Sequence, residues 1–555
     1  MSARRVVPGL AGAAGLIAVL TLLSRVVGFG RWFVFAAAVG STCTGTAYQA
    51  ANPVPNVLFE VVAGGALAAS VVPLLSGPLV SGPVLSGSSL SGDRIEADRT
   101  ASGLLTWAVL ALLPLAVLLA VLAGPVAGLL GRAGCPGQSA QTARMLVVFA
   151  PQVALYGVGV VLSGVLQAHR RFVAPALAPL LSSLVVIGAY AVYGHLAQGR
   201  QGTGWVPGRG TELVLSLGTT IGVAVLSLPL LVPTRRAGVR LRPTLRLPPG
   251  VAARARRLAV AGLAGLVAQQ VMVLAALLLT TRRGAGTINV YTYVQAVYLL
   301  PYAVLALPIA TAAFPGLSER AAAADPAGYS ATLSRSTRLV VLAAGAGAAV
   351  LAAAAPAVGQ VFAAVDASRS GGPGAAALVG FGDALTAFAP GLVGLALVAH
   401  LGRGLFAAGW VRWAAVSTAG GWLLAAVLSV VLVMAFTDGA AATLLAIGIA
   451  SSIGMTAAGA ALLVGAGRLR VGGVRPDGVL SGVPRTLVTT LVAGSLAAVA
   501  GRWVTDALLT GAAVPAALVA GGTGVAAAAA LLAVAWALVD GEDLRALAHR
   551  RRVRR

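Results

Sequence analysis

The strongest constraint on the fold is a series of apolar runs that are each long enough to cross a membrane. Hydrophobic residues make up 58% of the 555 residues, charged residues make up 10%, and the mean hydropathy is +0.93. A helix needs about 20 apolar residues to span the hydrocarbon core of a bilayer. The alternating ten-residue segments of an outer-membrane barrel are absent. This composition predicts an all-α polytopic membrane protein and excludes a soluble globular domain.

The apolar runs predict fourteen transmembrane helices. The predicted spans cover residues 9–39, 47–75, 101–127, 142–168, 173–196, 212–233, 257–280, 288–315, 336–358, 376–402, 413–436, 440–466, 486–506 and 512–538. The expected domains are an N-terminal lobe of six spans (1–233), a basic linker (234–256), a second six-span lobe (257–467), two further spans (468–539) and a basic tail (540–555).

The arginines predict the orientation of these spans. The net charge is +24, and the 39 basic residues are all arginine. Alternate loops, counted from the N-terminus, hold 29 arginines on one side of the membrane and 8 on the other. The positive-inside rule therefore places both termini in the cytoplasm. The arginines lie in short loops between spans, so we expect no nucleic-acid partner. The basic linker either lies on anionic lipid or is a simple topology anchor.

The first predicted span contains two arginines, Arg25 and Arg31. An arginine at the centre of a bilayer costs about 2.5–3.5 kcal/mol on insertion scales. Two of them in one helix predict a hydrated, cationic cavity and an anionic cargo. Gly28 and Gly30, between them, permit a bend or a close helix contact. In the alternative interpretation the span ends near Leu23 and both arginines lie in a loop.

The 15 acidic residues lie mostly in loops, and the exception is Glu60, inside the predicted span 47–75. A carboxylate within a membrane usually marks a functional site. It is a candidate partner for Arg25 or Arg31, acting as a gate or as a protonatable coupling group. A purely structural ion pair, or a position at the end of the span, are the alternatives.

The sequence gives no sign of an enzyme. The four histidines lie far apart, and none has the spacing of a metal site. A phosphate-binding GxxxxGK[ST] loop is absent, so ATP hydrolysis within this chain is excluded. We expect no metal and no cofactor, with transport coupled to the membrane potential or an ion gradient.

Several short segments resemble the MurJ/MviN family of lipid II flippases, within the multidrug/oligosaccharidyl-lipid/polysaccharide exporter superfamily. The matching segments are SRVVGFGR at 24–31, PN at 55–56, GGAL at 64–67, VPLL at 72–75, LQAHRRFVAPALAP at 166–179, and the region 301–318 with its proline at 301 and FPGLS at 314–318. The resemblance extends over the whole chain in span count and loop placement.

This resemblance implies a carrier in the bacterial inner membrane, built as two six-helix lobes in a V plus two C-terminal helices. A central cavity would bind the head group of undecaprenyl-linked peptidoglycan precursor, lipid II, and a groove near spans thirteen and fourteen would hold its tail. The head-group ligands would be Arg25, Arg31, Ser24 and Asn56, with coupling or gating at Glu60 and hinges at Gly28, Gly30 and Pro55. Membrane lipids and cell-wall synthesis proteins are the other expected partners.

The chain also departs from the family pattern. The family's basic residue in the second helix falls near Glu60, its acidic residue there falls at Thr46, and the basic residue of the eighth helix falls near Gln295. Acidic ion-site ligands in helices seven and eleven are not evident. Three alternatives therefore stay open: a flippase for another polyprenyl-linked glycan, a drug antiporter of the superfamily, and a non-transporting scaffold for wall synthesis.

Cys43 and Cys135 both fall on the predicted outer side of the membrane. A disulfide is chemically allowed in that oxidising compartment. Without distance information the sequence favours two unpaired thiols and leaves a bridge open.

Overall fold

The protein is almost entirely helical in the computed structural model. The structure describes residues 8–64, 89–131, 135–203, 205–246, 251–368, 372, 374–509 and 513–552. In these residues twelve helices are long and apolar enough to cross a membrane, or thirteen when one bent pair counts as a single span. Outside the helices, the described part of the chain has one isolated bridge between Val471 and Val474 and no strand. The predicted all-α polytopic membrane fold is confirmed.

The observed helices coincide with the predicted spans. Each of the twelve long helices overlaps one predicted span, and the bent pair Phe381–Phe388 and Gly391–Ala407 overlaps the predicted span 376–402. The remaining prediction, 47–75, begins in described helices and continues into residues outside the described part of the chain. The count of fourteen is thus approximate.

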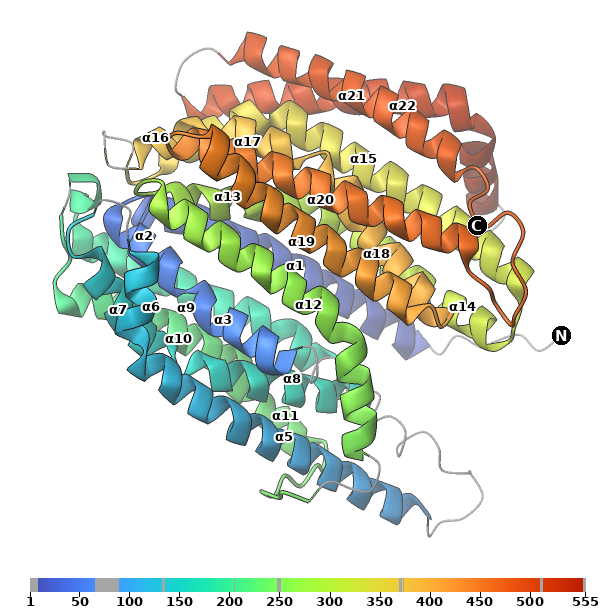
Figure 1. Cartoon of the computed structure of the whole chain (residues 1–555), viewed down its shortest axis with the longest axis horizontal. Coiled ribbons are helices and arrows are strands. Elements are labelled where there is room, and N and C mark those ends of the chain that lie inside the picture. Colours follow the sequence, from blue (N-terminus) through green and yellow to red (C-terminus); the bar gives the residue numbers. More distant parts are fainter. Residues whose placement is uncertain are drawn as a thin grey trace. The chain divides into compact units, whose positions relative to one another are not determined.

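The chain divides into two compact units: Met1–Gln270 with Asp366–Gly374, and Val271–Val365 with Ala375–Arg555. The first unit contains α1 (Pro8–Ala38), α2 (Cys43–Ala51), α3 (Pro53–Phe59), the π-helical turn η1 (Glu60–Gly64), α5 (Ser89–Val121), α6 (Ala123–Leu130), α7 (Gln138–Phe149), α8 (Gln152–Ala168), α9 (Val173–Ala197), η2 (Arg200–Thr203), α10 (Arg209–Ser227), η3 (Leu228–Leu230) and α11 (Leu231–Arg236). Figure 1 shows α1 as one uninterrupted helix.

The second unit follows α12 (Val251–Arg282), which crosses the boundary between the units. It contains α13 (Thr287–Pro301), the π-helical turn η4 (Tyr302–Ala306), α14 (Leu307–Ala322), α15 (Pro326–Val365), α16 (Ala375–Val379), α17 (Phe381–Phe388), α18 (Gly391–Ala407), α19 (Val411–Phe436), α20 (Ala440–Arg468), α21 (Val483–Leu508) and α22 (Val514–Arg552). The last two helices pack side by side (Figure 1).

The break between α17 and α18 shows how backbone groups inside a span are satisfied. Pro390 has no N–H to donate, and the two helices meet at 41°. The Ser452 hydroxyl of α20 shares its proton between the carbonyls of Ala387 (2.6 Å) and Phe388 (3.1 Å) and accepts the Gly391 N–H (3.0 Å). A neighbouring side chain thus replaces the hydrogen bonds that the bend removes, as lipid cannot.

Candidate functional site

The two arginines of α1 lie in an unbroken helix. Residues 8–38 form one helix, so the alternative in which the span ends near Leu23 is wrong. Arg25 is exposed, and the described residues offer it no ion pair or hydrogen bond. Arg31 is half-buried, and its guanidinium carbon lies 5.3 Å from the ring centroid of Trp32. Six residues of helix separate the two cations by about 9 Å along the axis and by about 120° around it.

Ring contacts connect Trp32, the neighbour of Arg31, to a buried network of phenols. The Trp32 and Phe35 ring centroids lie 6.3 Å apart, and Phe35 lies 5.4 Å from Tyr48 and 5.1 Å from Tyr190. The Tyr48 hydroxyl lies 2.9 Å from the Tyr190 hydroxyl and 2.8 Å from the Thr219 hydroxyl. Thr219 already donates its single proton to the Leu215 carbonyl, at 2.9 Å. Tyr48 therefore donates to Thr219, and Tyr190 donates to Tyr48, because each hydroxyl has one proton. This directed chain joins α2, α9 and α10.

Tyr156 of α8 lies in the surroundings of Glu60. The Tyr156 ring packs against Phe59, with the ring centroids 5.8 Å apart. Phe59 is the last residue of α3 and directly precedes Glu60.

Glu60 itself is half-buried and begins the π-helical turn η1. Turns of this kind are rare and occur frequently at functional sites. Within the described residues no ion pair joins Glu60 to Arg25 or Arg31 in this conformation. Pairing in another conformation stays a prediction.

The other predicted ligands lie on the same two segments. Ser24 is half-buried on α1, one residue before Arg25, and Asn56 is exposed on α3. The Asn56 carbonyl accepts the backbone N–H of Glu60. Their roles in binding stay predictions.

The predicted hinges differ in their surroundings. A Cβ atom at Gly28 would lie 3.8 Å from the Ser183 hydroxyl, and one at Gly30 would meet nothing within 4 Å. Neither glycine is therefore required by close packing, and α1 is continuous through both. Pro55 is buried in α3, just after the break at Asn52 that separates α2 from α3. That break follows from the proline at 53, which cannot donate to the preceding turn.

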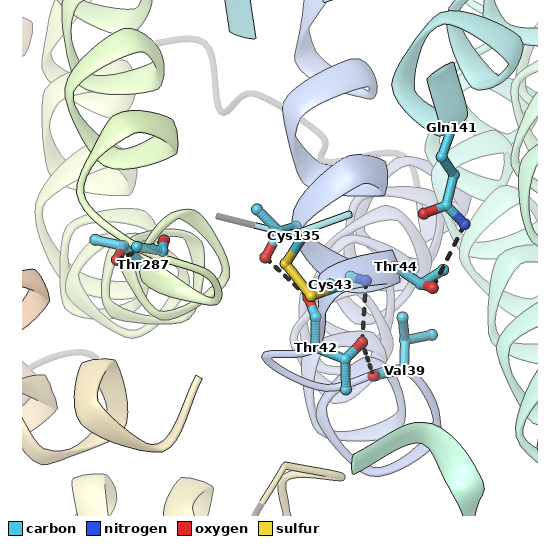
Figure 2. Close-up of a disulfide and its surroundings, with 10 residues drawn as sticks. Val39, Thr42, Cys43, Thr44, Cys135, Gln141 and Thr287 are labelled. Carbon is cyan, nitrogen blue, oxygen red and sulfur yellow. Dashed lines mark hydrogen bonds between the residues drawn. A yellow bond between two sulfur atoms is a disulfide. The ribbon is translucent and has the colours of Figure 1, made fainter. Parts of the chain in front are cut away.

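Cys43 and Cys135 form a disulfide, with their Cα atoms 5.7 Å apart. The preference for unpaired thiols was wrong. Figure 2 shows Cys43 at the start of α2, where the Thr42 hydroxyl donates to the Val39 carbonyl at 3.0 Å. The bridge joins this turn to the segment before α7, from which Gln141 reaches the Thr44 hydroxyl at 3.4 Å. The start of α2 is thereby cross-linked to the segment that precedes α7.

Two further charged groups escaped the sequence interpretation. The buried carboxylate of Glu212 accepts two hydrogen bonds from Arg144, at 3.0 and 2.6 Å. Asp366 is fully buried in the short segment that belongs to the first unit. It accepts the backbone N–H of Ser41 (2.9 Å) and of Ser368 (2.9 Å), and both serine hydroxyls, at 3.1 and 2.7 Å. Both acidic residues are thus structural parts of the first unit.

Known proteins resemble the chain in both sequence and fold. The "Probable lipid II flippase MurJ" of Synechocystis sp. is 31% identical over 250 residues, which is 43% of each chain. The "Lipid II flippase MurJ" of Burkholderia cenocepacia is 27% identical over 394 residues, covering 70% of this chain and 71% of the relative. The chain spans about half the length of the first two curated relatives that it matches, 43% and 53%.

Solved structures agree on the fold. The structure "Lipid II flippase MurJ, inward closed conformation" superposes with a TM-score of 0.69 at 17% identity, covering 94% of this chain and 98% of that one. An inward-facing MATE family multidrug resistance transporter of the MOP superfamily superposes with a TM-score of 0.60 at 14% identity, covering 86% and 98%. The family model described as "Lipid II flippase MurJ" matches residues 35–518. The chain, an integral membrane protein, therefore belongs to the lipid II flippase MurJ family.

Proposed function

We propose that this protein moves lipid II, the undecaprenyl-linked peptidoglycan precursor, from the cytoplasmic to the outer leaflet by alternating access. The observation that carries the proposal is the pair Arg25 and Arg31 within one continuous membrane helix. Charges at this depth are retained where they face a wet cavity or a ligand. The guanidinium fork matches phosphate oxygens bidentately, so a pyrophosphate linkage suits it.

The two arginines have different parts in this proposal. Arg25 is exposed and unpaired among the described residues, so it is available to meet the pyrophosphate first. Arg31 is half-buried, with its guanidinium carbon 5.3 Å from the ring centroid of Trp32. Ser24 and Asn56 add neutral polar groups for the sugar or the phosphate.

The polyprenyl tail needs an apolar site. The second unit contains a cavity of about 590 Å³ lined by α15, α18, α20 and α21. Its lining is mostly small and aliphatic, with residues such as Ala349, Val393, Leu463, Leu491 and Val499. Such a lining suits an isoprenoid chain, and its position on α21 agrees with the expected tail groove near the thirteenth span.

Two observations support an orientation with both termini in the cytoplasm. The arginine asymmetry, 29 against 8, follows the positive-inside rule. The Cys43–Cys135 disulfide fits the outer side, because disulfides persist in oxidising compartments. Transport in this scheme is driven by the membrane potential or an ion gradient.

Depletion and rescue tests the function. The gene is expressed in a host whose own lipid II flippase is shut off, and growth and outer-leaflet lipid II are measured. We expect both to be restored. Flipping of a different polyprenyl-linked glycan, or resistance to cationic drugs without rescue, would indicate one of the other transport functions. Loss of wall synthesis without any change in flipping would indicate a scaffold.

A further inference from the structure

The segment after α11 is fixed along α5 by a regular ladder of hydrogen bonds. Asp98 accepts the backbone N–H of Arg240 at 3.2 Å. The Ser102 hydroxyl accepts the N–H of Arg242 at 3.1 Å. The Thr106 hydroxyl accepts the N–H of Thr244, also at 3.1 Å. Every fourth residue of the helix thus binds every second residue of the segment.

The two spacings match, which explains why the ladder stays in register. Four residues of α-helix rise about 6.0 Å. Two residues of extended chain advance about 6.6 Å. The register is continued by Trp107, whose indole N–H donates to the Leu245 carbonyl at 3.1 Å. The first half of the basic linker is therefore a docked strand-like segment rather than a free tether.

The ladder sorts the side chains of the segment onto two sides. Val239 is 4% exposed and packs with Leu241 on a core formed by α5 and α8. The alternating residues Arg240 and Arg242 are exposed, as is Arg246. We call Arg240, Arg242 and Arg246 the arginine row. Its backbone is already ordered, so the row presents its charges with less conformational entropy to lose on binding.

The neighbours of the row are those of a bilayer interface. Trp107 is 46% exposed and Leu245 is 60% exposed, beside the exposed arginines. Tryptophan concentrates at the headgroup level of membranes, with its apolar ring inward and its N–H toward polar groups. Trp107 also lies within the candidate span Glu96–Val121, eight residues after Arg99, the last charged residue of that span.

The charge around the row is strongly positive. The exposed arginines of α5, α11 and the segment are Arg99, Arg235, Arg236, Arg240, Arg242 and Arg246. The acids on the facing turns of α5 are Glu96 and Asp98, and Asp98 is already engaged by a backbone N–H. A surface of this kind attracts anionic headgroups.

We propose that the arginine row is a binding site for anionic phospholipid headgroups, in the membrane leaflet next to the N-terminal part of α5. The site lies within the first unit and is separate from Arg25 and Arg31. The proposal of this lipid site therefore does not depend on the identity of the transported substrate. The ordered ladder, and not net charge alone, makes it a site.

Equilibrium binding of phosphatidylglycerol to the detergent-solubilised full-length protein tests the proposal, with phosphatidylcholine as the neutral lipid. An arginine near an anionic surface contributes about 1 kcal/mol, or about five-fold in affinity. Replacing all three with glutamine (R240Q, R242Q and R246Q together) should weaken phosphatidylglycerol binding by about ten- to a hundred-fold and leave phosphatidylcholine unchanged. The single variant Arg242→Gln should lose about five-fold, which keeps the test open if the triple variant folds poorly.

Two matched variants separate geometry from charge. The control triple R412Q, R470Q and R475Q removes the same charge from exposed arginines of the second unit and should keep wild-type affinity. The pair Ser102→Ala and Thr106→Val keeps every arginine but removes two rungs of the ladder, and should weaken binding several-fold. Equal losses in the control triple, or no loss in the ladder pair, would overturn the site. So would a loss confined to undecaprenyl pyrophosphate, because that result would assign the row to the transported lipid.

Discussion

Removal of the Cys43–Cys135 disulfide is expected to destabilise the first unit measurably. The bridge closes a loop with a sequence separation of 92 residues. In the chain-entropy model a loop of that length corresponds to about 4.6 kcal/mol at 25 °C. That value is an upper bound here, because α5 lies within the loop and stays inserted in the micelle when the bridge is cut. We expect the double variant Cys43→Ala and Cys135→Ala to lose about 2 kcal/mol of the free energy of unfolding.

The assay is unfolding in mixed micelles of mild detergent and dodecyl sulfate, followed by helix content and by Trp fluorescence. The wild-type protein is measured with and without a reductant, and so is the double variant. Reduced wild type should match the double variant, and the reductant should leave the double variant unchanged. A double variant as stable as oxidised wild type would refute the argument that the bridge restricts the chain.

Four further substitutions test the charged groups of the first unit. Arg144→Ala should lower the free energy of unfolding by about 3–5 kcal/mol, because it leaves the buried Glu212 carboxylate unpaired. Glu212→Gln should lower it clearly less, because the Arg144 side chain is 46% exposed and water can hydrate it. Equal costs in the same micelle titration would contradict this asymmetry. Asp366→Asn should destabilise by about 2–4 kcal/mol, since an amide accepts fewer of the serine hydrogen bonds than a carboxylate does; a wild-type midpoint would show that the carboxylate is not needed. Glu60→Gln should lower the flipping rate and flatten its dependence on pH, and an unchanged pH profile in proteoliposomes would remove Glu60 from coupling.

The sequence predicted the spans well because burial in lipid acts on each helix separately. A run of about 20 apolar residues can be recognised in the sequence of that segment alone, without knowledge of the helices that pack against it. Arg25 and Arg31 were placed inside the first span by the same logic, since only about nine apolar residues follow Arg31 before the next polar turn. The α17–α18 bend was less visible, because it depends on Ser452, which is distant in the sequence.

Pairings between distant segments were not predictable from the sequence. Tyr48 meets Thr219 across 171 residues, and Asp366 meets Ser41 across 325. No local pattern marks a residue as the partner of another one so far away. Cys43 and Cys135 gave a possible pair, but only the 5.7 Å separation of their Cα atoms decides it. The hydrogen-bond ladder between α5 and the linker was not predictable for the same reason. Its polar residues recur every four positions in α5, but nothing in the sequence pairs them with every second residue of the linker.

The most direct test of the proposed function is the flipping activity of Arg25→Ala and Arg31→Ala in cells that depend on this protein. Membrane insertion and abundance serve as controls, with Arg412→Ala as an arginine variant outside the first unit. The readout is the fraction of lipid II accessible on the outer face. We expect each α1 variant to insert normally and to abolish outer-face lipid II, while Arg412→Ala keeps it at the wild-type level. Near wild-type accessibility in both α1 variants would contradict the claim that these arginines carry the head group across the membrane.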